Sequence, residues 1–207
     1  MTSFARAERL ALADTLLAAG PEAPTLCAGW ATRDLAAHLV LRERRPDAAV
    51  GILLKPVAGH TKAVQDRLAA GDYTELIGKV RTPAFWVSPG FAEEAVNLVE
   101  FLVHHEDVRR AAPGWTPRTL DAAYEQAIAG RLKQSARLST RRFPAAITVQ
   151  PDGGTPFTVG KGGDAVTVNG TPQELLLFFT GRQAVADVTL TGPDAIAGKL
   201  KGARLGL

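Results

Sequence analysis

The chain has 207 residues, and its 24 Lys and Arg against 21 Asp and Glu leave a net charge of only +3. This length allows one large or two small domains with a buried core. The small charge excess, without basic runs interleaved with aromatic residues, argues against nucleic-acid binding. No stretch reaches the about 18 apolar residues of a membrane span, so we expect no membrane association.

The N-terminal residues carry charges within their apolar pattern, unlike a signal peptide. Cys27 is the single cysteine, so an internal disulfide is impossible. Together these features favour a location in the reducing cytoplasm.

Residues 1 to about 140 have the apolar spacing of helices. Gly20 and Pro21 end the first helix, and Thr32 is a candidate N-cap for the second. A short basic group of Arg42, Arg44 and Arg45 is typical of a solvated helix end. The predicted helices cover approximately residues 4–19, 32–45, 57–80 with a break at 71–72, 91–111 and 119–139.

The pattern changes near Phe143 and Pro144, where apolar and polar residues begin to alternate as in strands. Thr171 and Glu174 predict a helix start with a capping box. Strands are expected near 147–149, 157–159, 165–168 and 185–190, and a closing helix over 194–200. We therefore predict an antiparallel four-helix bundle over residues 1–142, followed by a small α+β domain over residues 143–207.

The candidate chemistry lies in two apolar helices. Glu100 and His104 are four residues apart, so they share one face of a helix that is apolar all round. A buried carboxylate is costly unless something compensates its charge, and a metal ion does so. His38 offers an imidazole in a second apolar helix, and facing helices of a bundle commonly build metal sites. The sequence predicts a divalent metal ion, with zinc as the expected metal, bound by His38, Glu100 and His104, with one coordination position left open.

Two segments resemble the mycothiol-dependent maleylpyruvate isomerase family, which belongs to the DinB-like metal-binding bundles. They run from Trp30 to Leu39 and from Asn97 to Ala111, and the resemblance covers roughly residues 5–140. It implies a metal held at the positions of His38, Glu100 and His104. More loosely, residues 170–176 and 180–182 are similar to that family's sterol-carrier-like C-terminal domain.

The resemblance implies an enzyme that uses a low-molecular-weight thiol, such as mycothiol, with an electrophilic second substrate. A metal-bound thiol loses its proton readily and becomes a thiolate nucleophile. We therefore expect a metal-dependent thiol transferase or isomerase. Arg182 follows Gly181 at a helix end, where a cation suits the helix dipole without any further function. Alternatively, Arg182 binds an anionic group of the substrate. The alternative is a non-catalytic metal-binding protein whose C-terminal domain encloses an apolar ligand.

Several other side chains are candidates for lesser roles. Asp107 is three residues after His104 and could orient its imidazole or pair with an arginine. His105 and Glu106 point elsewhere around the helix and are expected at its surface or behind the ligands. His60 is expected in a loop, away from the metal. Cys27 is expected to be a packing residue rather than a reactive thiol, and Trp30, Trp86 and Trp115 are expected to be packing anchors.

Overall fold

The structure is a computed structural model that describes residues 3–163 and 165–206. The chain divides into two compact units, Met1–Thr116 and Pro117–Leu207. The sequence pattern placed this boundary at 142/143 because α7 (Ala122–Ser139) is helical like everything before it. In the structure α7 packs along α8 (Pro172–Phe179) of the second unit, and its buried residues recur at one-turn spacing. The division therefore falls before α7, and each unit is described by itself below.

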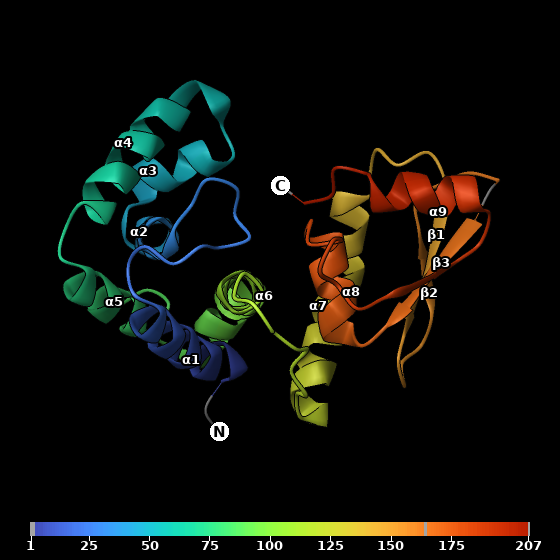
Figure 1. The fold of residues 1–207 in the computed structure, drawn as a ribbon, viewed down its shortest axis with the longest axis horizontal. Coiled ribbons are helices and arrows are strands. Elements are labelled where there is room, and N and C mark those ends of the chain that lie inside the picture. Colours follow the sequence, from blue (N-terminus) through green and yellow to red (C-terminus); the bar gives the residue numbers. More distant parts are fainter. Residues whose placement is uncertain (1–2, 164, 207) are drawn as a thin grey trace. The chain divides into compact units, whose positions relative to one another are not determined.

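The first unit is helical, as expected (Figure 1). Three short helical elements that the sequence did not predict follow Arg45, because Pro46 begins a new helix as its first residue. The elements are α1 (Phe4–Ala19), α2 (Thr32–Arg44), α3 (Pro46–Ala49), the 3₁₀ turns η1 (Val50–Ile52) and η2 (Lys55–Val57), α4 (Ala58–Ala69), α5 (Tyr73–Arg81) and α6 (Gly90–Arg109).

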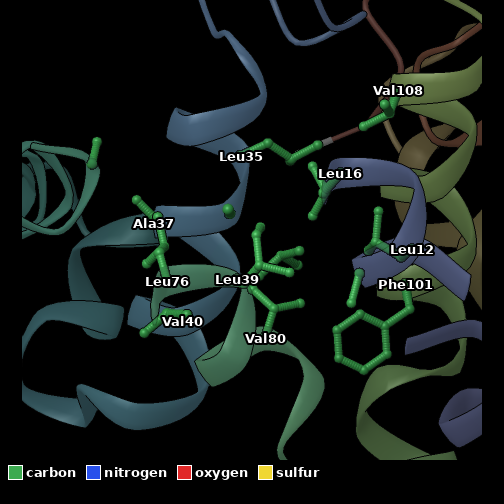
Figure 2. Packing of buried hydrophobic residues seen from close by; sticks show 14 residues of the cluster. Leu12, Leu16, Leu35, Ala37, Leu39, Val40, Leu76, Val80, Phe101 and Val108 are labelled. Carbon is green, nitrogen blue, oxygen red and sulfur yellow. The ribbon is translucent and has the colours of Figure 1, made fainter. Parts of the chain in front are cut away.

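The core of the first unit lies between these helices (Figure 2). Leu12 and Leu16 of α1 meet Leu35 of α2, Leu76 of α5 and Phe101 of α6 in one buried cluster. Ala69 of α4 also belongs to this cluster, so five helices of the described chain contribute to it. Short, fully buried residues such as Ala36 and Ala37 let α2 pack closely against α4 and α5.

The start of α2 differs in detail from the expectation. Ala31, not Thr32, is the N-cap, and the Asp34 carboxylate accepts a 2.9 Å hydrogen bond from the Ala31 amide. The Thr32 hydroxyl is fully buried and donates to the carbonyl of Gly20. Thr32 thus connects the end of α1 to the start of α2, and Asp34 supplies the negative charge that the helix dipole favours.

A buried arginine connects four helices of the first unit. Arg9 of α1 is fully buried, and its guanidinium donates to Glu43 of α2 at 2.8 and 2.9 Å, to Glu93 of α6 at 2.5 Å and to the Val80 carbonyl of α5 at 2.8 Å. The guanidinium carbon also lies 4.4 Å from the ring centroid of Phe101. Because buried carboxylates require such partners, Arg9 helps to determine how α2 and α6 face each other.

The second unit combines helices with a four-stranded sheet of order β2-β1-β3-β4. The central strands β1 and β3 are parallel, with Ile147 opposite Val166, and both edge strands are antiparallel to their neighbours. Leu175 to Phe179 of α8 are all buried. The elements besides α7 and α8 are β1 (Ala146–Pro151), β2 (Phe157–Val159), β3 (Ala165–Gly170), β4 (Thr189–Thr191) and α9 (Asp194–Lys201).

Two expectations for this unit need correction. Residues 185–188 do not form a strand, because the amides of Val185 and Ala186 both donate to the Arg182 carbonyl in a turn, so β4 begins only at Thr189. Thr171 caps α8 as predicted, but the Glu174 carboxylate accepts from the Asp187 amide at 2.8 Å. Among the described residues, no helix of either unit is long and apolar enough to cross a membrane.

Candidate metal site

The structure brings the three predicted ligands together within the first unit. His38 Nε2 and His104 Nε2 each lie 3.3 Å from Glu100 Oε1. One ligand atom from each residue lies within 4.8 Å of the other two. The two imidazole rings meet edge to face, with their centroids 5.3 Å apart. The three side chains thus form one compact nitrogen–oxygen–nitrogen cluster between α2 and α6.

Helix packing explains why these side chains converge. On α2, the apolar residues around His38 are buried, and His38 itself is 8% exposed. On α6, Glu100 and His104 are one turn apart, so their side chains lie along the same face. His104 is 8% exposed, whereas the side chain of Glu100 is 25% exposed. Glu100 therefore lies where the cluster meets solvent.

Burial and mutual hydrogen bonds set the charges of the cluster. Burial by itself would raise the pKa of Glu100, but hydrogen bonds from His104 and His38 outweigh it and hold that pKa well below its usual range. Burial likewise opposes the charged form of His104, yet hydrogen bonds to Asp107, Cys27 and Glu100 raise its pKa well above the usual value. For His38 burial dominates, so its pKa is lowered. In the metal-free site, the surroundings therefore favour the ionised form of Glu100, the protonated form of His104 and the neutral form of His38.

Asp107 holds His104 from behind. Its Oδ2 lies 2.8 Å from His104 Nδ1, and its side chain is fully buried. An Nδ1–H that donates to this carboxylate leaves Nε2 directed at Glu100, which is the nitrogen required for a ligand. Of the two roles predicted for Asp107, the structure shows the first: its carboxylate orients the imidazole of His104.

Cys27 lies beside the same pair, although the sequence assigned it to packing. Its Sγ is 3.2 Å from Asp107 Oδ2 and 3.9 Å from His104 Nδ1, and it also packs against the hydrophobic core. The Leu26 amide donates to the Asp107 carbonyl at 3.0 Å, so the segment before α2 is fastened to α6 at this point. No spacing pattern could have predicted this contact, because it depends on the path of the chain between Gly20 and Ala31.

Arg42 belongs to the site as well, which the sequence reading missed. Its Nε is 3.3 Å from Glu100 Oε1, and its two other nitrogens donate to Asn97 Oδ1 at 2.7 Å and to the Val96 carbonyl at 3.0 Å. It was expected at a solvated helix end. Its position four residues after His38 carried the usable signal, because residues at this spacing share a helix face.

The indole ring of Trp30 packs against the imidazole of His38, with their ring centroids 5.1 Å apart. The same tryptophan also lines a cavity of about 390 Å³, together with polar side chains that include Asp34, Gln65 and Lys62. Trp30 packs partly against the core as well, so its expected packing role is observed. The indole therefore contacts both the metal-ligand cluster and this hollow.

The remaining candidates have partners outside the cluster. His105 is buried and bonds Glu8 at 2.6 Å and Thr15 at 2.8 Å, so it connects α6 to α1 instead of lying at the surface. Glu106 is buried too, and it pairs with Arg110 at 2.6 Å. His60 is not in a loop but in α4, where its Nε2 is 3.1 Å from Asp47.

Trp86 is 47% exposed, so it is not the packing anchor that was expected, although its Nε1 donates to the Glu43 carbonyl. Trp115 packs as expected, with its ring centroid 4.7 Å from the guanidinium carbon of Arg110. Arg182 lies in the second unit, where its Nη1 donates to the Thr180 carbonyl at 2.6 Å. Its predicted role in binding a substrate anion stays a prediction.

The donor set fits a small divalent ion. Two imidazole nitrogens and one carboxylate oxygen are normal zinc ligands, and two ligands of a tetrahedral zinc ion lie about 3.3 Å apart. Both nitrogen-to-oxygen distances in the cluster are 3.3 Å. The carboxylate behind His104 is the support that metal-binding histidines usually have. The donor types and their spacing therefore fit a divalent metal ion at this cluster.

The fold and the site thus define a two-unit protein whose helical unit carries a His–Glu–His cluster and whose second unit is a small α+β domain. Comparison of the whole chain with solved structures identifies the same fold in the crystal structure of a mycothiol-dependent maleylpyruvate isomerase. The match covers 92% of this chain and 96% of that one, with a TM-score of 0.50 and 17% sequence identity. The expected resemblance is therefore confirmed for the fold.

A mutant of such an isomerase also matches, with a TM-score of 0.48 and 16% identity over the same shares of the two chains. No family model matches the sequence, and a search of curated proteins finds no match either.

Proposed function

We propose that this protein is a metal-dependent enzyme that uses a low-molecular-weight thiol, such as mycothiol, for S-transfer or isomerisation of an electrophilic substrate. The convergence of His38, Glu100 and His104 into one cluster is the observation that carries this proposal. We further propose that α1, α2, α5 and α6 correspond to the four helices of a DinB-like bundle. The similarity to an isomerase that depends on mycothiol supports the choice of thiol.

Zinc is the metal we propose, because two imidazoles with one carboxylate are typical of catalytic zinc sites, which keep a position for a further ligand. When bound, the ion would lower the pKa of a thiol and so supply a nucleophilic thiolate at neutral pH. The chain's own residues would support this chemistry. Asp107 would hold the proton on Nδ1 of His104, and Trp30 would shield His38 from water.

Two measurements test this function. Purified protein should contain close to one zinc ion per chain by elemental analysis, and His38→Ala and His104→Ala should each lose most of it. His60→Ala is the matched control, because His60 is an exposed histidine on α4. After replacement of zinc by cobalt, mycothiol should add a sulfur-to-cobalt charge-transfer band in the near ultraviolet.

The proposal fails if both ligand variants keep the wild-type zinc content. If the cobalt protein loads fully and no thiol changes its spectrum, the protein does not act on thiols through this site. A non-catalytic metal-binding protein whose second unit binds an apolar ligand would then be the better description.

A further inference from the structure

Arg42 is fixed at the solvent side of the ligand cluster by acceptors from α6. Its Nη1 donates to the amide oxygen of Asn97, and its Nη2 donates to the carbonyl of Val96. Both acceptors are neutral. The carboxylate of Glu100, 3.3 Å from Nε, is the one negative charge that Arg42 contacts among the described residues. The guanidinium is therefore positioned by neutral groups and neutralised only by a residue of the metal cluster.

Metal binding would change the charge balance around this arginine. A divalent ion bound to Glu100 would be partly neutralised by the carboxylate. The guanidinium of Arg42 would then lie beside a dication, and Glu100 would no longer neutralise the guanidinium. The contacts to Asn97 and Val96 would still hold the guanidinium in place. A fixed cation of this kind favours a negatively charged ligand group next to it.

Arg42 also keeps the means to bind such a group. A guanidinium has five N–H donors in a planar fork, and the three contacts above use one donor on each nitrogen. One hydrogen on Nη1 and one on Nη2 remain for a further acceptor. The Arg42 side chain is 25% exposed, so a small molecule can reach it from solvent.

We propose that Arg42 is a specificity-determining residue that binds a carboxylate group of the second substrate beside the metal. The site would thus select electrophiles that carry a carboxylate over neutral ones of the same shape. This inference rests on the proposed function, because it presumes a metal at Glu100. It assigns the anion-binding role to a residue of the first unit, where the ligand cluster itself lies.

Succinate is a suitable probe because it carries carboxylates and does not react with thiols, and succinamide is its neutral counterpart. Both would be titrated into the cobalt-loaded protein and followed by visible absorption. Arg42→Gln should weaken succinate binding roughly 10- to 100-fold, which is the range for losing charge-assisted hydrogen bonds. Arg42→Lys should give an intermediate loss, since lysine keeps the charge but not the fork. Binding of succinamide should stay the same in all variants.

Arg45→Gln is the matched control, because Arg45 follows the same helix but pairs with Asp47 outside the cluster. This variant should bind succinate like the wild type. Metal content is measured in parallel and should stay near one ion per chain in Arg42→Gln and Arg42→Lys.

Equal succinate affinity in wild type and Arg42→Gln at matched cobalt content would overturn the inference while leaving the proposed function intact. Loss of the metal from both Arg42 variants would also overturn it, because Arg42 would then serve only to support Glu100. Failure of the wild type itself to hold a metal would instead reject the proposed function.

Discussion

At the scale of single residues, the fully buried Asp107 makes several of the contacts that hold the site together. It accepts from His104 and contacts the thiol of Cys27, while its backbone carbonyl accepts from Leu26. One residue therefore orients a candidate ligand and attaches the segment that leads into α2. Removing its charge should affect metal binding even though Asp107 is not a ligand in the His38–Glu100–His104 set.

Asp107→Asn should weaken zinc binding by about 10- to 100-fold, the usual cost of changing the hydrogen-bond partner of a metal-bound histidine. Asparagine has nearly the same shape, so the fold should be retained. The measurement is a competition titration with a chromophoric chelator. Asp47→Asn, at a surface position on α3, should leave zinc affinity unchanged. Equal affinity in Asp107→Asn and wild type would show that the carboxylate does not support the ligand.

The pH dependence of zinc binding should follow His104. Its pKa is raised in the metal-free protein, whereas that of His38 is lowered, so His104 is the residue whose proton zinc must displace. Zinc affinity should then rise with pH, by up to about tenfold per pH unit, and level off once the pH exceeds the raised pKa of His104. Calorimetry in two buffers of different ionisation enthalpy would measure the released proton.

Asp107→Asn supplies the control for this prediction. It removes the hydrogen bond that does most to raise the pKa of His104, so its affinity should level off at a lower pH. A zinc affinity that is independent of pH from the acidic to the alkaline side of neutrality would contradict the assignment.

At the scale of elements, the two ligand-bearing helices are held in place by a residue that is not one of the candidate ligands. Arg9 of α1 bonds Glu43 of α2 and Glu93 of α6, and all three are buried. Burying these three charges costs desolvation free energy when the protein folds. Removing one of the three residues, however, leaves a buried charge without its partner. The mutual position of α2 and α6, and hence of His38 and Glu100, depends on it.

Arg9→Met should lower the free energy of unfolding by about 3–5 kcal/mol, because two buried carboxylates lose their cation. The triple variant Arg9→Met, Glu43→Gln, Glu93→Gln should recover part of this loss. Urea denaturation followed by circular dichroism gives both values. Arg81→Met removes a partly exposed ion pair with Asp14 and should cost less than about 1 kcal/mol. A similar loss for Arg81→Met and Arg9→Met would contradict the role of burial.

Sequence patterns predicted the helices and strands better than the tertiary contacts that these elements make. An imidazole and a Glu–His pair within apolar helices indicated His38, Glu100 and His104, and local turn residues indicated most helix ends. The contacts of Cys27 and Arg9 were not predictable, because they depend on chain paths and helix orientations that tertiary packing decides. The unit boundary was misplaced for a similar reason. Helical periodicity identifies α7 as a helix but does not reveal that α7 packs along α8 of the second unit.

At the scale of the whole molecule, all three candidate ligands lie in the first of the two compact units. Metal binding adds to the stability of a folded unit by mass action, about 4 kcal/mol at a metal concentration of 1,000 times Kd. The second unit has its own sheet and its own buried helix, α8. Its stability should therefore respond little to the metal.

Removal of the metal should accelerate amide hydrogen exchange in α2 and α6 and leave β1, β3 and α8 unchanged. The measurement is exchange followed by mass spectrometry on the full chain, with and without a strong chelator and with metal loss confirmed. His104→Ala should exchange like the metal-free wild type under both conditions. Equal acceleration in both units, or none in α2 and α6, would contradict the assignment of the metal to the first unit.

Four consecutive residues of α6 are each committed to a different neighbour. His104 faces Glu100, His105 bonds Glu8, Glu106 pairs with Arg110, and Asp107 returns to His104. Each further residue turns a helix by about 100°. Inserting or deleting one residue just before this segment would therefore turn His105 away from Glu8 of α1 and His104 away from His38 of α2. We expect changes of length in related chains to accumulate in the connections that precede α2 and follow α6, and not within this helix.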